Sequence, residues 1–242
     1  MLAIIKDIVK SFLVRKSRSK AIRCKDLEAG TRILILAPHP DDEVFGCGGL
    51  IKHLVDSGIQ PNVVVMSGGG ASHKSCCNVA SDTIIENRRM LTKKALASLG
   101  VKPENIHFLD FNDSKIGDRP QSEMSRLKEI VETVNPDTLF LPHHGEGWPD
   151  HLAVREIGLD MAPESCSVYE YCVWWWFYRQ SNPGWRNAYS LKMTPAEHKA
   201  KLNAIQIYSN ASAPCGKPWI GVLPNLFVKA NSDKTELFFK VK

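Results

Sequence analysis

The stretch LILAPHPDDEVFGCGG (34–49) carries one imidazole and three carboxylates directly after an apolar run, at His39, Asp41, Asp42 and Glu43. Neighbouring carboxylates repel one another and lose hydration when they are buried, so the cluster needs a compensating charge. A divalent cation supplies that charge, because it favours the ionised form of each carboxylate that it contacts. The cluster therefore indicates a metal site. The alternative is a phosphate or sugar site, where strand-end clusters of this kind also occur.

The spacing inside the cluster suggests different roles for its two aspartates. His39 and Asp42 lie three positions apart in a loop that enters a helix, so both can reach one ion. Zinc accepts imidazole nitrogen and carboxylate oxygen, and a catalytic zinc keeps one position open for water. Asp41 then points elsewhere and is free to take a proton from that water. A third ligand must come from another loop, and PHHGEGWPDHLAV (142–154) supplies the candidates His143, His144 and His151.

Alternating strands and helices must bring these residues together. Apolar, β-branched runs alternate with segments whose apolar residues recur at helical spacing, which predicts a parallel sheet covered by helices on both faces. In such a sheet the loops at the carboxyl ends of the strands meet at one rim. An aspartate at a strand end is also a common helix N-cap, which is the alternative role for Asp42 and Asp150. The predicted strands are 32–37, 61–66, 106–110, 138–142 and 167–177, and the predicted helices are 48–57, 82–99, 122–134 and 150–160.

The C-terminal part of the chain differs in pattern. Residues 195–210 have helical spacing, and Pro195 suits a first helical turn. The segments 219–230 and 235–242 are interpreted as short strands, antiparallel and at the sheet edge. The predicted fold class is therefore α/β, a Rossmann-like three-layer sandwich with a mostly parallel sheet and an antiparallel C-terminal edge, formed by residues 26–242 as one domain.

Composition narrows the class of protein. The chain has 242 residues, 43% of them apolar and 24% charged, which is ordinary for a globular domain with a full core. The net charge of +5 lies largely in the first 25 residues, so we expect no nucleic-acid partner. Seven cysteines without a CxxC spacing favour a reducing compartment over a disulfide scaffold. We therefore expect a cytoplasmic protein.

Residues 1–25 form a predicted basic amphipathic helix. One interpretation places this helix on an anionic membrane surface, as a peripheral contact at the inner membrane face. The other packs it on its own domain, or on a second subunit of a homo-oligomer. The apolar run is broken by charges and no small-residue cleavage site follows, so a cleaved signal peptide is not expected. The apolar face is Ile5, Ile8, Val9 and Phe12, and the charges are Lys6, Lys10, Arg15 and Lys16.

The first motif resembles that of a known family. APHPDDEVFGCGG is similar to the AHPDDE signature of the PIG-L/LmbE-like zinc-dependent N-acetylglucosaminyl deacetylases. ENRRMLTKKALASLGV (86–101) resembles the family's arginine-bearing helix, FLDFND (108–113) its substrate-side loop, and WPDHLAV (148–154) its second motif, HPDH. The resemblance runs from about residue 31 to about residue 212.

The resemblance implies a role for each matching residue. His39, Asp42 and His151 match the ligands of Zn²⁺, or of another divalent metal such as Fe²⁺, and Asp41 matches the general base. The implied reaction is hydrolysis of the acetamide of an N-acetylated amino sugar, which is free, nucleotide-linked, lipid-linked or part of a glycoside. The residues that would hold sugar hydroxyls or a diphosphate are Arg88 and Asp113.

One position departs from the family pattern. Trp148 replaces the first histidine of HPDH, and its indole N–H is a neutral donor that cannot act as an acid. We expect His144 to take over that catalytic role, with His143, the metal alone or impaired catalysis as alternatives. Trp148 itself would form a platform against a sugar ring. It also favours the alternative function, a non-catalytic sugar-binding or regulatory module on the same fold.

Overall fold

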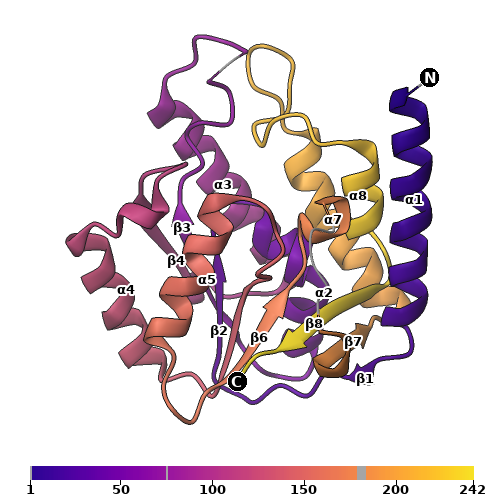
Figure 1. Ribbon diagram of the computed structural model, residues 1–242. Helices are drawn as coiled ribbons and strands as arrows, with labels where there is room; N and C mark the ends of the chain where they lie inside the picture. The colour runs from indigo at the N-terminus through magenta and orange to yellow at the C-terminus, as the bar shows by residue number, and fades with distance from the viewer. Residues whose placement is uncertain (1, 75, 179–183) are drawn as a thin grey trace.

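The computed structural model describes residues 2–74, 76–178 and 184–242, which form one mixed sheet between layers of helices (Figure 1). Within these residues the sheet has eight strands in the order β1-β7-β8-β6-β5-β2-β3-β4. The strands are β1 Lys25–Asp26, β2 Ile33–Ala37, β3 Asn62–Ser67, β4 Ile106–Phe111, β5 Thr138–Pro142, β6 Ser167–Tyr171, β7 Ala188–Lys192 and β8 Thr235–Lys240. The helices are α1 Leu2–Ala21, α2 Asp42–Asp56, α3 Ser81–Leu99, α4 Gln121–Val134, α5 Pro149–Met161, α6 Trp175–Tyr178, α7 Pro195–Asn210 and α8 Asn225–Asn231.

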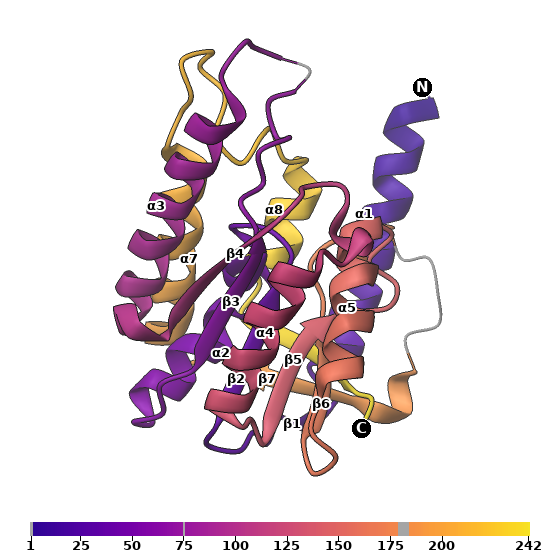
Figure 2. The ribbon, with the colours of Figure 1, turned by 90° about the vertical axis from the view of Figure 1, so that its left-hand side faces the viewer.

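The two faces of the sheet carry separate apolar cores. Successive side chains of a strand point to opposite faces, so in β2 Ile33 and Ile35 join one core while Leu34 and Leu36 join the other. Helices α2, α3 and α7 cover the first face, and α4 and α5 cover the second. Figure 2 shows α3 and α7 on one side of the sheet and α4 and α5 on the other. This confirms the predicted three-layer α/β sandwich.

The central strands run parallel and fix the position of the first motif. Strand β2 pairs in parallel with β3 and with β5, in registers that include Leu34 with Asn62 and Ile33 with Thr138. The loops that follow β2, β3, β4 and β5 therefore leave the sheet at the same rim. The motif after β2 lies in the middle of that rim, where it can meet residues from the loops on either side.

The C-terminal part of the sheet differs from the expectation in two respects. Strand β8 is antiparallel to β6 and β7, as predicted, but it lies between them, and β1 forms the edge, parallel to β7. Residues 219–230, predicted as a short strand, form no strand; the structure instead forms α8, in which Phe227 and Ala230 are buried three positions apart. Apolar content alone did not distinguish this short buried helix from a strand.

The aromatic segment 167–177 is also divided differently. Strand β6 ends at Tyr171, and Trp175–Tyr178 form the short helix α6. Trp175 and Trp176 are buried there beneath α1 and β8. A run of large aromatic residues packs well in either structure, so the sequence did not show where the strand ends.

Helix α1 packs along part of its length on its own domain. Val14 and Ala21 are buried, and the guanidinium of Arg18 lies 3.6 Å from the ring centre of Trp176. Its apolar residues Ile8, Val9 and Phe12 are 63%, 50% and 64% exposed, and the side chains of residues 1–7 lie outside the described part. Among the described residues, no helix combines the length and apolar character needed to cross a bilayer. Membrane contact and oligomerisation stay predictions.

Candidate metal centre

Three predicted ligands converge at the rim. His39 follows β2, Asp42 is the first residue of α2, and His151 lies in the first turn of α5. Oδ2 of Asp42 is 3.4 Å from Nδ1 of His39 and 3.3 Å from Nε2 of His151. One donor atom from each of the three residues lies within 4.8 Å of the other two. This compact N,N,O set brings together residues that are more than a hundred positions apart.

Each imidazole turns its second nitrogen towards an outer carboxylate. Nδ1 of His151 lies 3.2 Å from Oε2 of Glu146. Nε2 of His39 lies 3.0 Å from Oδ2 of Asp150 and 3.3 Å from Oδ1 of Asp113. A histidine that binds a metal usually donates its other N–H to a carboxylate, which fixes the ring and its tautomer. His39 has this hydrogen bond with Asp150, and Nδ1 of His151 lies within ion-pair distance of Glu146.

The outer carboxylates are themselves held by backbone N–H groups. Glu146 is fully buried and accepts hydrogen bonds from the N–H groups of Val173 and Trp174 at 2.8 and 2.6 Å. Asp150 accepts from the N–H groups of Ser114 and Ile116 at 2.7 and 3.2 Å. Asp150 thus orients His39. The structure does not show it as the N-cap of α5, which was the alternative role predicted for it.

The charges of the centre fit a bound cation. Burial alone would lower the pKa of His151, but the carboxylates of Asp42 and Glu146 raise that pKa to about 9. At His39, too, burial acts to lower the pKa. The carboxylates of Asp113, Asp150 and Asp42 nevertheless raise that pKa well above its usual value. The surrounding carboxylates therefore create a strong negative potential at both rings. A divalent ion would relieve it, and the imidazole and carboxylate donors suit zinc or iron.

Asp41 lies beside the ligand set in a strained conformation. Its φ of 113° is in a region that residues other than glycine rarely adopt, and its N–H donates to Oε2 of Glu43 at 2.9 Å. Burial raises the pKa of the Asp41 carboxyl well above its usual value, and the nearby Arg88 opposes that rise. The loop thus turns Asp41 away from the ligands but keeps it at the same cavity.

Arg88 is buried and contacts the motif directly. Its Nη2 donates to the carbonyl of Pro40 at 2.6 Å and lies 3.5 Å from Oδ2 of Asp41, while Nη1 donates to the carbonyl of Gly69 at 2.9 Å. Gly69 has a φ of 66°, and a Cβ there would lie 2.0 Å from Nη1. These contacts attach Arg88 to the loop that carries Asp41, and its predicted role in holding substrate stays a prediction.

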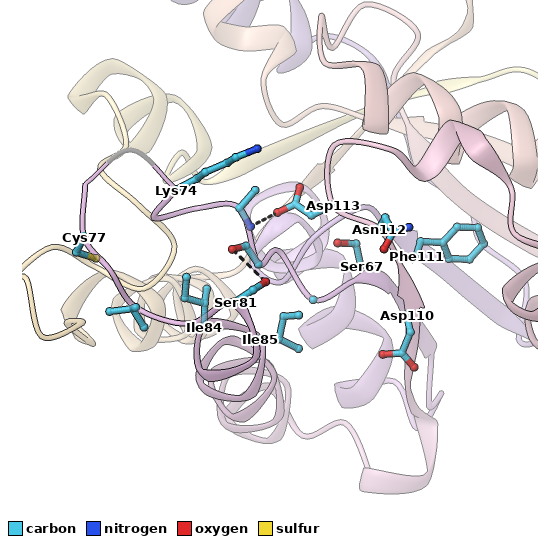
Figure 3. A pocket seen from close by; sticks show the side chains of 14 residues that line it. Ser67, Lys74, Cys77, Ser81, Ile84, Ile85, Asp110, Phe111, Asn112 and Asp113 are labelled. Carbon is cyan, nitrogen blue, oxygen red and sulfur yellow. Dashed lines mark hydrogen bonds between the residues drawn. The ribbon is translucent and has the colours of Figure 1, made fainter.

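A cavity of about 250 Å³ opens onto the centre, and a larger one of about 580 Å³ adjoins it. The two share Ala71 and Asp113, whose N–H and Oδ2 are hydrogen-bonded at 2.7 Å. Figure 3 shows this bond in the larger cavity, with Ser67, Asn112 and Lys74 around it. The smaller cavity is lined by residues that include His39, Asp41, Asp42, Arg88, Asp113, Trp148, His151 and Trp174.

Trp148 lies in the cavity wall, whereas His144 does not. The Trp148 ring is half-exposed and lies 5.5 Å from the ring of Trp174 and 6.5 Å from that of Tyr178. Nδ1 of His144 lies 2.8 Å from Oε2 of Glu170, and His144 is not among the residues that line the cavity. The structure therefore does not bring His144 to the position that the substitution of Trp148 would require.

Glu146 is the site residue that the sequence analysis missed. It lies within the predicted loop 142–154, three positions after His143, and it was passed over in favour of the histidines. The available signal was a carboxylate between two glycines after a buried strand. Its contact with His151 depends on how the loop folds back, which residue spacing does not reveal.

Comparison with known proteins agrees with this geometry. The family model described as "PIG-L: GlcNAc-PI de-N-acetylase" matches residues 34–162. The diacetylchitobiose deacetylase of Thermococcus kodakarensis is 33% identical over 135 residues, covering 53% of this chain and 48% of that protein. The 1D-myo-inositol 2-acetamido-2-deoxy-alpha-D-glucopyranoside deacetylase of Corynebacterium diphtheriae is 28% identical over 149 residues, covering 53% of this chain and 51% of that protein.

The same fold is found in a solved structure of a pseudoaglycone deacetylase, Dbv21. It superposes with a TM-score of 0.67 at 18% identity, and the match covers 87% of this chain and 96% of that chain. At this identity the likeness shows the fold. The chain spans about half the length of the two curated relatives above.

Proposed function

This chain belongs to the PIG-L family, and from that premise we propose that it is a zinc-dependent hydrolase that removes the acetyl group from an N-acetylated amino sugar. The observation that carries the proposal is the arrangement of His39, Asp42 and His151 around one point, with Asp41 beside them at the same cavity. A metal-binding set together with a separate acid or base can hydrolyse an unactivated amide.

His39, Asp42 and His151 would hold the metal, and Glu146 and Asp150 would keep the two imidazoles in their binding orientation. When bound, the ion supplies a Lewis acid that acidifies water and polarises the acetamide carbonyl. Iron(II) is an alternative to zinc, because imidazole and carboxylate ligands suit both.

Asp41 would transfer the proton. Its carboxylate accepts a proton from the attacking water, and the same group then gives that proton to the departing amine nitrogen. The products are acetate and a free amino sugar. Arg88 keeps the Asp41 loop in place through the carbonyls of Pro40 and Gly69. Because His144 is bonded to Glu170, we assign both proton transfers to Asp41 and none to His144.

The substrate would lie across the two adjoining cavities. Trp148 and Trp174 offer aromatic surface to the face of a sugar ring, and Asp113 offers a carboxylate to its hydroxyls. The larger cavity beyond Asp113 has room for the group attached to the sugar, and its wall carries Lys74 together with the carboxylates of Asp110 and Asp113. This suggests a conjugate of N-acetylglucosamine with a bulky second part.

The test is a deacetylation screen with measured metal content. The zinc-loaded protein is incubated with free, nucleotide-linked, lipid-linked and glycosidic N-acetylglucosamine, and free amine and acetate are quantified. We expect the wild type to release acetate and free amine from at least one conjugate. The variant His151→Ala should lose both this activity and the metal of the His39 centre. Tight binding of a conjugate with no release from any of them would contradict the proposal and favour the sugar-binding module that Trp148 suggests.

A further inference from the structure

A second cluster of metal-binding residue types lies outside the centre described above. His73, Cys76 and Cys77 come from the loop between β3 and α3, and Cys215 comes from the loop between α7 and α8. One nitrogen of His73 and the three sulfurs all lie within 4.8 Å of one another. The cluster shares no residue with the His39 centre.

The separations within this cluster match a tetrahedral zinc site. The Sγ atom of Cys76 is 3.6 Å from that of Cys77 and 3.8 Å from that of Cys215. Nδ1 of His73 is 3.2, 3.4 and 3.5 Å from the sulfurs of Cys76, Cys77 and Cys215. Zinc–sulfur bonds of about 2.3 Å and zinc–nitrogen bonds of about 2.0 Å at tetrahedral angles place two sulfur ligands about 3.8 Å apart. The same geometry places a sulfur and a nitrogen ligand about 3.5 Å apart. Five edges of the tetrahedron therefore have nearly the required length.

His73 is oriented for this role by the opposite ring nitrogen. Its side chain is buried, and Nε2 lies 2.9 Å from the carbonyl oxygen of Pro218. A carbonyl can only accept, so Nε2 carries the hydrogen and Nδ1 of the neutral ring presents a lone pair to the sulfurs. Carbonyl acceptors of this kind are typical supports of metal-binding histidines.

Neither of the metal-free alternatives accounts for the cluster. Three thiols approach a single ring nitrogen, which can accept one S–H hydrogen bond, so the other two thiols gain no comparable acceptor from it. The sulfur–sulfur separations of 3.6 and 3.8 Å describe free cysteines and not a disulfide. Three thiolates and an imidazole are a common ligand set of structural zinc.

We propose that His73, Cys76, Cys77 and Cys215 bind one structural Zn²⁺, which fastens the loop after β3 to the loop before α8. The two loops already touch, since Oγ of Ser72 donates to the carbonyl of Trp219 at 3.0 Å.

The two loops form walls of the adjoining cavities. Lys74 and Cys77 line the larger cavity, and Ile220 and Leu223 line the smaller one. The ion therefore stabilises the wall on the substrate side while leaving the His39 centre chemically independent.

The experiment releases zinc from the purified, reduced, zinc-loaded chain with an organomercurial, and measures the release with a colorimetric zinc indicator. No cysteine lies among the ligands of the His39 centre. Thiol modification therefore displaces zinc only from the cluster of His73, Cys76, Cys77 and Cys215. We expect one equivalent per chain from the wild type and from His151→Ala. Because His151→Ala removes a ligand of the other centre, this result separates the present proposal from the proposed hydrolase function.

Variants locate the released zinc. Cys76→Ser and Cys215→Ser should release almost none, whereas Cys24→Ser, a free cysteine elsewhere in the fold, should match the wild type. Zinc release that is equal in Cys215→Ser and the wild type would overturn the proposal.

Cobalt substitution keeps the test decisive if the cysteine variants do not fold. A chain loaded with Co²⁺ should show the strong near-ultraviolet absorption of thiolate-to-cobalt charge transfer, and His151→Ala should retain it. If the wild-type chain binds cobalt without that absorption, or mass spectrometry of the reduced, zinc-loaded chain finds a disulfide among these cysteines, the proposal is wrong.

Discussion

At the scale of single residues, Asp41 is the clearest case of a side chain placed for chemistry. It is buried, it has a positive φ, and it stands beside the ligand set without belonging to it. We expect Asp41→Asn to retain the metal and to lose about 10²–10⁴-fold in turnover, because an amide cannot accept the proton. Metal content and kcat, measured on the same sample, check this.

The matched control for Asp41 is Asp56→Asn, an exposed aspartate at the other end of α2. It should leave both metal content and kcat unchanged. Activity that survives in Asp41→Asn would mean that another group is the base.

Trp148 gives a second residue-scale prediction. The side chain is half-exposed and contacts other aromatic rings at the cavity wall, so its replacement should cost little packing energy. Trp148→His restores the family residue and should keep or raise kcat/KM, since an imidazole can carry a proton that indole cannot. Trp148→Phe keeps an aromatic surface and serves as the control. A large drop in the melting temperature of Trp148→His would identify Trp148 as a packing residue instead.

The site was predictable at this scale where its residues are contiguous. His39, Asp41 and Asp42 lie within one short motif, so their position at one site could be predicted from the sequence. Glu146 acts only through His151, and Cys215 joins His73 from 142 positions away, so their contacts depend on the tertiary fold. Spacing along the chain carries no signal for either.

At the scale of elements, a buried ion pair forms hydrogen bonds with the backbone of helix α2. Nζ of Lys201, on α7, donates to the carbonyl of Phe45 at 3.0 Å and to Oε1 of Glu236, on β8, at 2.6 Å. Glu236 in turn accepts from the N–H groups of Gly49 and Leu50 at 2.7 and 2.8 Å. Phe45 and Gly49 lie one helical turn apart, so the ion pair contacts the backbone of α2 at both ends of that turn.

Lys201→Met should therefore destabilise the protein strongly. The substitution leaves the buried Glu236 without its counter-charge, which costs about 3–5 kcal/mol in the free energy of unfolding. Urea unfolding measures this loss. Adding Glu236→Gln should recover part of it, because the uncompensated charge is removed. The control Lys199→Met, exposed on the same helix, should change stability by less than about 0.5 kcal/mol. A similar value for both lysines would contradict this account.

Helices and strands were predictable from the sequence where the length of a segment and the spacing of its apolar residues indicate the same structure. Segments without that agreement were predicted less well. Residues 195–210 were predicted as a helix and form α7 with the same bounds, supported by the capping box of Thr194 and Glu197. Strand β7 and the two-residue strand β1 were not predicted, because their pairing with the C-terminal strand, and not their own pattern, makes them part of the sheet.

At the scale of the whole molecule, bound metal should contribute to the stability of the fold. The ligands of the His39 centre come from the start of α2 with the loop before it and from α5, which are far apart in the unfolded chain. Zinc at about a thousand times its dissociation constant would add about 4 kcal/mol per site, or on the order of 10 °C in melting temperature for a chain of this size.

Calorimetry before and after chelation measures this effect. Returning zinc should restore the melting temperature, whereas Mg²⁺, which prefers oxygen ligands, should not. Equal melting temperatures with and without metal would show that neither cluster binds metal in the native state.

The direction of the strands also fixes how the two chain ends stand relative to the cavities. Helix α1 begins at the end of the molecule to which the parallel strands point, and the antiparallel β8 carries the C-terminus to the opposite end (Figures 1 and 2). A bead or resin attached through the C-terminus would consequently leave the cavity mouth facing open solvent. Attachment ahead of Leu2 would turn that mouth towards the support, so immobilised preparations of the two kinds should differ in their access to large conjugates.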